Sequence, residues 1–335
     1  MPWKGESDPY RIWLSEIILQ QTRVEQGMAY YQKFILRFPT IQDLANAPEK
    51  EVFKFWEGLG YYNRCRNLIA AAKKIAFEKK GLFPSSYNLL LQLPGIGPYT
   101  AAAIASFAFG LPYAVVDGNV ERVLARYFGI STPVGSVSGK KLYSTLAAEL
   151  LDRKEPAVFN QAIMDFGATI CKPQNPLCEV CVQAEKCQSF QQGWTTRLPL
   201  KIKAAVRKNR YLYYFIVEKK KGKIWIRERT GKDIWKNLYE FVLWESGKII
   251  PQKKLTQSAF FREQFGNRGL QIVHVSPVYS QLLTHQFITG CFVHLDKPLS
   301  KLDGYQSVSV SKLKDYPFPK FIKDYIQLST GSDPW

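Results

Sequence analysis

Apolar residues recur at helical spacing through the first half of the chain. In the segment SDPYRIWLSEIILQQT, Trp13 and Leu14 are each followed four residues later by Ile17 and Ile18, a spacing typical of one face of an α-helix. The Ser-Asp pair and the Pro that open this segment suit a cap and a first helical position. Further helices are predicted over EKEVFKFWEGL, RCRNLIAAAKKIAFEKKG and SYNLLLQL, with Gly or Pro at or near their ends. The pattern predicts an all-α first half.

The pattern changes in the second half. YLYYFIV, GKIWIRER, LQIVHVS and GCFVHL are short, aromatic and β-branched, which indicates strands, and KLTQSAFFREQFG is a helical segment among them. A polar, basic stretch broken by Gly193 and Pro199 precedes the strands and predicts a linker. Because 335 residues are many for a single core, we predict a helical domain over 1–190, a linker over 191–210 and an α+β domain over 211–335.

Composition narrows the function classes. No apolar run reaches the length of a membrane span and no signal peptide opens the chain, so we expect a soluble, cytoplasmic protein. The formal net charge is +18, with +5 in residues 1–200 and +13 in residues 201–335. A basic excess of this size favours a polyanionic partner, chiefly nucleic acid.

A glycine-rich corner lies in LPGIGPYTAAAIA. Gly95 and Gly97 allow close approach of the backbone, and a second helix is expected to begin near Pro98. Amide N–H groups at a helix N-terminus form an anion site. Alone, the corner could be a tight helical turn without a ligand; together with the charge it favours a helix-hairpin-helix that grips phosphate.

Two acidic residues are candidates for chemistry. Asp117, in AVVDGNVER, is placed to cap a helix that starts near Val120, where the helix dipole favours an ionised carboxylate. Glu16 lies among Trp13, Ile17 and other apolar residues of its helix, an environment that resists ionisation and suits a general acid. A salt-bridged helix residue is an equal alternative for Glu16.

Four of the six cysteines fall within CKPQNPLCEVCVQAEKC, with the spacing C-x6-C-x2-C-x5-C. Such crowding in an intracellular protein points to a metal rather than to disulfides. Four close thiolates suit zinc or an iron–sulfur cluster. The ligand candidates are Cys171, Cys178, Cys181 and Cys187, whereas Cys65 and Cys291 stand alone.

Taken together, LPGIGPYTA, VDGNV, WLSEIILQQT, GLGYYNRCRNL and the cysteine spacing resemble the endonuclease III superfamily and, within it, the adenine DNA glycosylase family. The resemblance covers essentially the whole chain. It implies an all-α helix-hairpin-helix catalytic domain with a [4Fe–4S] cluster in the loop over 171–187, followed by an α+β Nudix-like domain. It also implies one more helix ahead of Pro2 and Trp3.

The resemblance assigns catalytic roles to residues of this sequence. Glu16 would protonate adenine and assist the attacking water, while Asp117, with Asn119 beside it, would stabilise the oxocarbenium-like sugar. Tyr99 stands where the endonuclease III branch has a lysine that attacks the sugar, so no strand cleavage is expected. We expect Tyr99 to hydrogen-bond near Asp117.

The resemblance also implies contacts with DNA. These are Gln21, Thr22 and Tyr61 beside the mispair, Gly95 and Gly97 at phosphate, and Thr284 and His285 on 8-oxoguanine in the second domain. Leu283-Thr284-His285 stands where the family commonly has Phe-Ser-His, which keeps a hydroxyl and loses an aromatic ring.

The expected activity is therefore removal of adenine mispaired with 8-oxoguanine or guanine in double-stranded DNA, by a monomer, leaving an uncut abasic site. One alternative is an endonuclease III-like glycosylase and lyase for damaged pyrimidines. Another is a non-catalytic iron–sulfur DNA-binding protein. A Nudix hydrolase would need a glutamate cluster, and the corresponding helix offers Glu263 without a paired acidic run.

Overall fold

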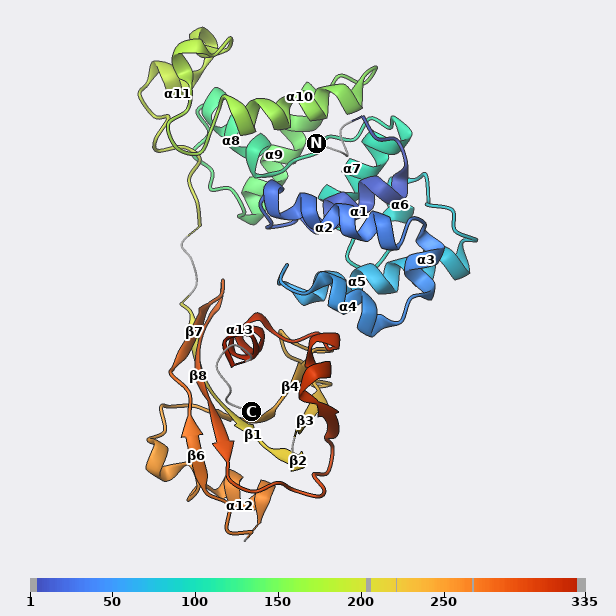
Figure 1. Ribbon diagram of the computed structural model, residues 1–335. Coiled ribbons are helices and arrows are strands. Elements are labelled where there is room, and N and C mark those ends of the chain that lie inside the picture. Colours follow the sequence, from blue (N-terminus) through green and yellow to red (C-terminus); the bar gives the residue numbers. More distant parts are fainter. Residues whose placement is uncertain (1–4, 203–205, 221, 267, 330–335) are drawn as a thin grey trace. The chain divides into compact units, whose positions relative to one another are not determined.

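A computed structural model describes residues 5–202, 206–220, 222–266 and 268–329 (Figure 1). Residue contacts divide the chain into two compact units: unit 1 comprises Met1–Ala47 and Arg66–Ala204, and unit 2 comprises Pro48–Cys65 and Ala205–Trp335. Grouping of Pro48–Cys65 with the second unit was not anticipated from the sequence. The boundaries 1–190, 191–210 and 211–335 stay predictions; 203–205 of that linker, like Pro2 and Trp3, lie outside the described residues.

Unit 1 is helical, as predicted. Its helices are α1 (Pro9–Leu19), α2 (Val24–Arg37), α3 (Ile41–Asn46), α6 (Tyr87–Leu90), α7 (Pro98–Phe109), α8 (Gly118–Tyr127), α9 (Val137–Leu150), α10 (Pro156–Thr169) and α11 (Gln188–Gln191). A π-helix, η1 (Lys74–Glu78), follows Lys73 directly, and two short 3-10 turns are η2 (Cys178–Val180) and η3 (Ala184–Lys186). Helix α4 (Glu49–Trp56) belongs to unit 2, and α5 (Tyr62–Lys73) begins there and continues into unit 1.

Local sequence explains where these helices start and stop. The Asp8 side chain accepts the Tyr10 N–H at 2.8 Å and Pro9 is the first residue of α1, as predicted. The helix expected to run up to Leu93 ends earlier, at Leu90. The correction has a physical reason, because Pro94 disfavours helical backbone at the residue before it.

Helix α1 packs against α7 and α2, and α8 packs against α10. Trp13, Leu14 and Ile18 of α1 are fully buried. Helix α7 carries alanines at its centre, and these short side chains let α1 approach its backbone closely. The packing matters for function because α1, α7, α8 and α10 supply most of the walls of a large cavity in unit 1.

Unit 2 contains two sheets. The first has the order β5-β1-β8-β6, with β7 also paired to β8: β1 (Lys208–Ile216), β5 (Val242–Ser246), β6 (Ile272–Val275), β7 (Tyr279–Leu282) and β8 (Gln286–Leu295). The second comprises β2 (Glu218–Lys220), β3 (Lys223–Glu228), β4 (Tyr239–Glu240) and β9 (Gln306–Ser309). The remaining elements are η4 (Gln252–Lys254), α12 (Ala259–Phe265), η5 (Val310–Asp315) and α13 (Lys320–Ser329).

The centre of the first sheet is the parallel pair β1–β8, in which Tyr214 lies opposite Phe292. Phe292 stacks on Tyr325 of α13 with ring centroids 3.7 Å apart, whereas Phe215 points to the other face and packs on Phe261 of α12. Gly290 is required here because a Cβ would lie 2.2 Å from the Leu212 carbonyl oxygen. The sheet is thus covered by a helix on each face, the α+β arrangement that the sequence predicts.

Candidate active site

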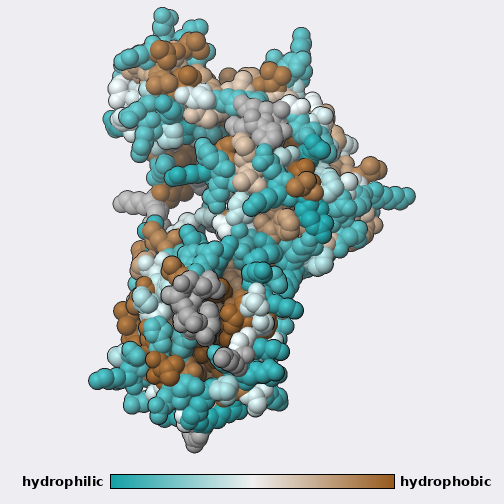
Figure 2. Space-filling view, in the orientation of Figure 1, coloured by the Kyte–Doolittle hydropathy of each residue, from teal (hydrophilic) through white to brown (hydrophobic). Residues whose placement is uncertain are grey.

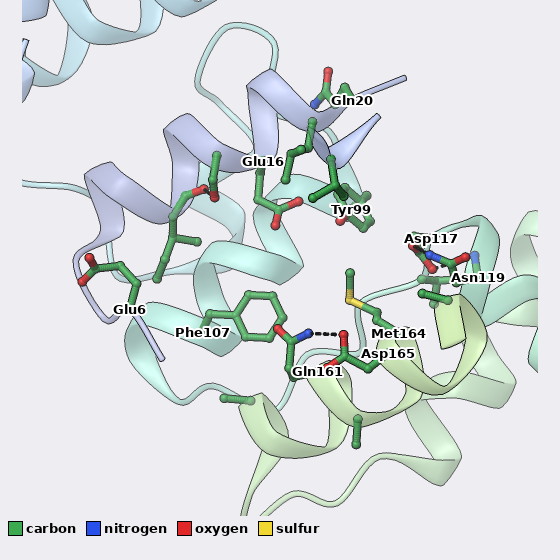
Figure 3. Close-up of a pocket in the computed structure, with 18 of the residues that line it drawn as sticks. Glu6, Glu16, Gln20, Tyr99, Phe107, Asp117, Asn119, Gln161, Met164 and Asp165 are labelled. Atoms are coloured by element: carbon green, nitrogen blue, oxygen red, sulfur yellow. Dashed lines mark hydrogen bonds between the residues drawn. The ribbon is translucent and has the colours of Figure 1, made fainter. Parts of the chain in front are cut away.

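A cavity of about 910 Å³ lies in unit 1 and is lined by α1, α7, α10 and the start of α8. It brings together the four predicted catalytic residues, which come from three separate parts of the sequence: Glu16, Tyr99, Asp117 and Asn119. Figure 3 shows Glu16 and Tyr99 close to each other on one side of the cavity and Asp117 and Asn119 on another. Gln21 and Thr22 line the same cavity.

Glu16 is a buried carboxyl group in a helix of apolar neighbours. Its side chain forms a hydrogen bond with Tyr99 rather than a salt bridge. Burial raises the pKa of Glu16 to about 7; the nearby charge of Asp117 adds to the rise, and the Tyr99 hydrogen bond opposes it. Glu16 therefore holds a proton at neutral pH far more often than an exposed glutamate does.

Tyr99 is the second residue of α7, and its half-buried side chain lies beside Glu16. Burial, and then the charge of Glu16, hold the pKa of Tyr99 well above its usual value. The phenol is therefore a hydrogen-bond donor at neutral pH. The expected bond near Asp117 is corrected to one with Glu16, although Asp117 is near enough to raise the pKa of Tyr99 further.

Asp117 caps α8, as predicted. Its Oδ1 accepts the N–H groups of Asn119 and Val120, both at 2.8 Å, and its Oδ2 accepts the Asn119 side-chain amide at 2.7 Å. These three donors fix the orientation of the carboxylate at the cavity wall. Asn119 is thus a direct hydrogen-bond partner of Asp117.

Arg122 connects this capped turn to the cysteine loop. Its Nη2 donates to the Asn119 side-chain oxygen at 2.8 Å and to the Gly167 carbonyl at 2.7 Å, and its Nε donates to the Cys171 carbonyl at 2.7 Å. A Cβ at Gly167 would lie 2.7 Å from the Asn119 Cβ. The close approach of α10 to α8 therefore requires glycine at that position.

The four predicted cysteine ligands line one small cavity of about 60 Å³: Cys171, Cys178, Cys181 and Cys187. Arg126 Nη1 lies 3.4 Å from the Cys171 sulfur and donates to the Lys172 carbonyl at 2.7 Å. Burial, and then the three other cysteines, raise the pKa of Cys178. Within the described ranges, no group of three or more His, Cys, Asp or Glu side chains is arranged to hold a metal ion.

The cysteine loop buries little of its own surface. Its short turns η2 and η3 contain no buried residue, and Figure 2 shows apolar side chains on the surface around α11. Exposed apolar residues of the loop and of α11 are Leu177, Val180, Val182 and Phe190. Hydrophobic burial is therefore a minor source of order here. The four thiols are the type of ligand that an iron–sulfur cluster takes, although they are not arranged as a metal site among the described residues.

The glycine-rich corner has the predicted geometry at one of its two glycines. Gly95 has φ +74° and a Cβ there would lie 2.5 Å from the Asn67 Cβ, so glycine is required. Gly97 has an ordinary φ and open space around it. Gly97 is the N-cap residue of α7, and no side chain caps its first turn, which leaves amide groups for an anion.

Three residues that were predicted to contact DNA fall in unit 2: Tyr61, expected beside the mispair, and Thr284 and His285, expected on 8-oxoguanine. Tyr61 is 48% exposed, has φ +48°, and its hydroxyl lies 2.8 Å from the Thr284 hydroxyl. His285 is adjacent, on the turn that joins β7 and β8, and its carbonyl accepts the Lys208 N–H at 2.9 Å. Tyr61 and Thr284, from opposite ends of the sequence, are thus brought together within this unit.

Sequence reasoning missed several residues that line the large cavity: Gln20, Phe107, Gln161, Met164 and Asp165. Gln161 Nε2 donates to Asp165 Oδ1 at 2.9 Å (Figure 3), and Gln20 Nε2 donates to the Thr100 hydroxyl at 3.2 Å. A signal was available for the first pair, because two polar residues four apart share one face of α10.

Comparison with known families agrees with this arrangement. A model described as "HhH-GPD superfamily base excision DNA repair protein" matches residues 14–145, and a "NUDIX domain" model matches residues 213–328. These matches define the class, a helix-hairpin-helix base excision repair protein followed by a Nudix-like domain, and confirm the predicted fold class.

No helix among the residues described here is both long and apolar enough to cross a membrane.

Individual relatives are more specific. The adenine DNA glycosylase of Buchnera aphidicola subsp. Schizaphis graminum is 36% identical over 288 residues, which cover 82% of each chain. Human adenine DNA glycosylase is 43% identical over 202 residues, which cover 57% of this chain and 37% of the human one. The chain therefore belongs to the adenine DNA glycosylase family.

Solved structures support the fold of the helical part. A thermostable thymine-DNA glycosylase is 33% identical with a TM-score of 0.52, and the match covers 57% of this chain and 88% of that chain. A non-covalent endonuclease III–DNA complex is 24% identical with a TM-score of 0.50, covering 56% and 86% respectively. At 24% identity, the similarity to the endonuclease III complex supports a shared fold and nothing more specific.

Proposed function

We propose that this protein removes adenine mispaired with 8-oxoguanine or guanine from double-stranded DNA, by hydrolysis of the N-glycosidic bond, and leaves an uncut abasic site. The observation that carries the proposal is the meeting of Glu16, Tyr99 and Asp117 in one cavity. Membership of the adenine DNA glycosylase family indicates that the base removed is adenine.

The cavity has the size that the reaction needs. An adenine inside a duplex must be rotated out of the stack before its glycosidic bond can be reached. A cavity of about 910 Å³ has room for a nucleoside. Glu16 and Asp117 both line it, so an extruded nucleotide meets two carboxyl groups.

Glu16 acts as the general acid. Its raised pKa keeps a proton on a large share of the molecules at neutral pH, and an adenine ring nitrogen receives that proton as the bond to the sugar breaks. After proton transfer the Tyr99 hydroxyl donates its hydrogen bond to the Glu16 carboxylate. The same carboxylate then assists the attacking water.

Asp117 stabilises the sugar. Its carboxylate, held by three N–H donors, offers negative charge to the oxocarbenium-like transition state. The division of labour parallels glycoside hydrolysis, in which one protonated and one ionised carboxyl group flank the scissile bond. The three donors keep the carboxylate in place, so little reorganisation accompanies the reaction.

Tyr99 explains why the strand stays intact. A lyase reaction requires an amine that attacks the sugar and forms a Schiff base. A phenol cannot form one. The base is therefore released by water, and the abasic site remains uncut.

The cysteines would hold a [4Fe–4S] cluster through their four thiolates. The cluster would supply structural order to the loop at 171–187, in which few residues are buried. Arg126 supports the loop by hydrogen bonds to the Cys171 sulfur and to the Lys172 carbonyl.

The remaining assignments concern DNA. The uncapped first turn of α7, with Gly95 and Gly97, binds phosphate. Gln21, Thr22 and Tyr61 contact the duplex beside the mispair, and Thr284 and His285 contact the base opposite the adenine. The protein works as a monomer in the cytoplasm, and its charge of +18 supports sequence-independent DNA binding.

The test is a single-turnover assay on duplexes that carry adenine opposite 8-oxoguanine or guanine, each sampled with and without alkali. Strand cleavage only after alkali is expected. Cleavage without alkali would show that an amine attacks the sugar and would overturn the role given to Tyr99. Asp117→Asn should be inactive, and Glu25→Gln on the exposed face of α2 serves as the matched control. Activity retained in Asp117→Asn would favour another catalytic group.

A further inference from the structure

Within unit 2, the segment Pro48–Cys65 is held by one buried carboxylate, that of Glu57. The Glu57 side chain is 6% exposed, and its Oε2 lies 2.9 Å from Lys54 Nζ and 3.0 Å from Lys323 Nζ. Its Oε1 accepts the Phe318 N–H at 3.1 Å. Lys323 lies on α13 and Phe318 just before it. Because a buried carboxylate needs all its partners, removal of one is costly.

Two lysines of α4 extend this attachment. Lys54 Nζ also donates to the Tyr316 carbonyl at 3.2 Å, and Lys50 Nζ lies 3.2 Å from the centroid of the Tyr316 ring. The Tyr316 ring in turn packs edge-on against Tyr239, with centroids 4.8 Å apart. The whole length of α4 is thus fixed to the C-terminal part of unit 2.

Tyr61 follows Glu57 by four residues in the same segment. The turn before Tyr61 is closed by a hydrogen bond from Trp56 Nε1 to the Gly60 carbonyl at 3.0 Å. The Tyr61 hydroxyl then meets the Thr284 hydroxyl at 2.8 Å, across 223 residues of sequence. An exposed tyrosine can keep so distant a partner only if the segment that carries it is fixed.

We propose that Glu57 is a positioning residue for recognition of the purine opposite the target adenine, acting by holding Tyr61 beside Thr284. The inference rests on the proposed function, in which Tyr61 stands beside the mispair and Thr284 contacts that purine. The ion pairs of Glu57 act at one end of the segment, and the paired hydroxyls form a preassembled contact at the other. The ligand class is an oxidised or unmodified guanine in duplex DNA.

The experiment uses the full chain with its native cysteine-bound group. The measured quantity is the preference ratio, defined as the single-turnover excision rate for adenine opposite 8-oxoguanine divided by the rate for adenine opposite guanine. Glu57→Gln should lower this ratio by about fivefold, the equivalent of one hydrogen bond. In a Thr284→Val background, the same substitution should change the ratio by less than about twofold, because the contact through which Glu57 acts is already absent.

A second set of variants tests the proposal even if Glu57→Gln fails to fold. Lys323→Met removes one partner and leaves Lys54 and the Phe318 amide in place. It should lower the ratio in the same direction, while Lys323→Arg should keep it. Lys320→Met, on the exposed start of the same helix α13, is the matched control and should leave the ratio unchanged.

The outcomes separate this inference from the function on which it rests. A wild-type protein that removes no adenine from either duplex would overturn the proposed function itself. A wild-type preference that survives intact in both Glu57→Gln and Lys323→Met would overturn the role of Glu57 alone. Equal loss of rate on both duplexes, with a lowered melting temperature and no dependence on Thr284, would make Glu57 a structural residue and would also overturn it.

Discussion

The hydroxyl of Tyr99 is hydrogen-bonded to the carboxyl group of Glu16 in one cavity, where Glu16 is buried and Tyr99 is half-buried. The bond opposes the two effects that raise the pKa of Glu16, namely burial and the charge of Asp117. Tyr99 therefore sets how much of the acid form is present at neutral pH.

The first prediction is a pH dependence of excision. With Glu16 as general acid, the single-turnover rate should fall about tenfold per pH unit above its pKa of about 7. Glu16→Gln should lower the rate by roughly a hundredfold or more and remove this alkaline limb. A rate that stays constant from pH 6 to pH 9 in the wild-type protein would show that Glu16 is not the proton donor.

Tyr99→Phe should move the alkaline limb to higher pH. The Tyr99 hydrogen bond lowers the pKa of Glu16. Without this bond, burial and the charge of Asp117 should raise that pKa further, and Glu16 should stay protonated to a higher pH. The pH–rate profile of the variant measures this shift directly. A limb displaced to lower pH would mean that Tyr99 favours the protonated rather than the charged form of Glu16.

Glu16 also makes stability depend on pH. Its pKa is about 4.5 in the unfolded chain and about 7 in the fold, so the folded state binds more protons between these values and stability falls as pH rises through that window. Above pH 7, Glu16→Gln should therefore be more stable than wild type, by about 3 kcal/mol at most. Urea unfolding at pH 4.5 and pH 8 checks this, with Glu25→Gln as the exposed control; equal stability at pH 8 would contradict it.

Much of the fold follows from local sequence patterns. The cap of α1, the start of α7 at Pro98 and the strands β1 and β8 are all marked by residue types and spacing. The parallel pairing of β1 with β8 is not, because Tyr214 and Phe292 lie 78 residues apart and periodicity carries no information about partners. For the same reason, the grouping of Pro48–Cys65 with the C-terminal part of the chain was missed.

Some residues of the candidate site could likewise be predicted from the sequence, and others could not. Glu16 and Asp117 could be named from sequence because each is an acid in an unusual apolar or capping position. The partner of Tyr99 could not, since Glu16 and Asp117 both lie near it and only packing of α1 against α7 decides between them. The spacing of Gln161 and Asp165 places them on one face of α10, but only packing decides that this face lines the cavity.

Asn160 should prove essential to the loop that leads to Asp117. Its buried side chain accepts the Val115 N–H and donates to the Tyr113 carbonyl and the Ser106 hydroxyl, each at 2.9 Å. Asn160→Leu leaves these three backbone and hydroxyl groups without this hydrogen-bond partner. It should therefore lower the free energy of unfolding by roughly 3 kcal/mol. Chemical denaturation measures the loss. Asn88→Leu, at an exposed position of α6, is the control, and equal stability of the two variants would contradict the prediction.

His294 gives unit 2 a pH dependence of opposite sign to that of Glu16. Burial, and then His274, lower the pKa of His294 to about 4 in the fold, against an ordinary value of about 6.5 in the unfolded chain. The unfolded state therefore binds more protons between these values, and stability should fall as pH falls from 6.5 to 4. The His294 ring nitrogen lies 2.5 Å from the Tyr325 hydroxyl, so in the protonated form the ring donates and the hydroxyl oxygen accepts in this contact. His294→Gln should flatten this acid limb of the stability profile, measured by thermal unfolding across that range. His285→Gln, on an exposed turn, should leave it unchanged, and an acid limb of the same slope in His294→Gln would assign it to other groups.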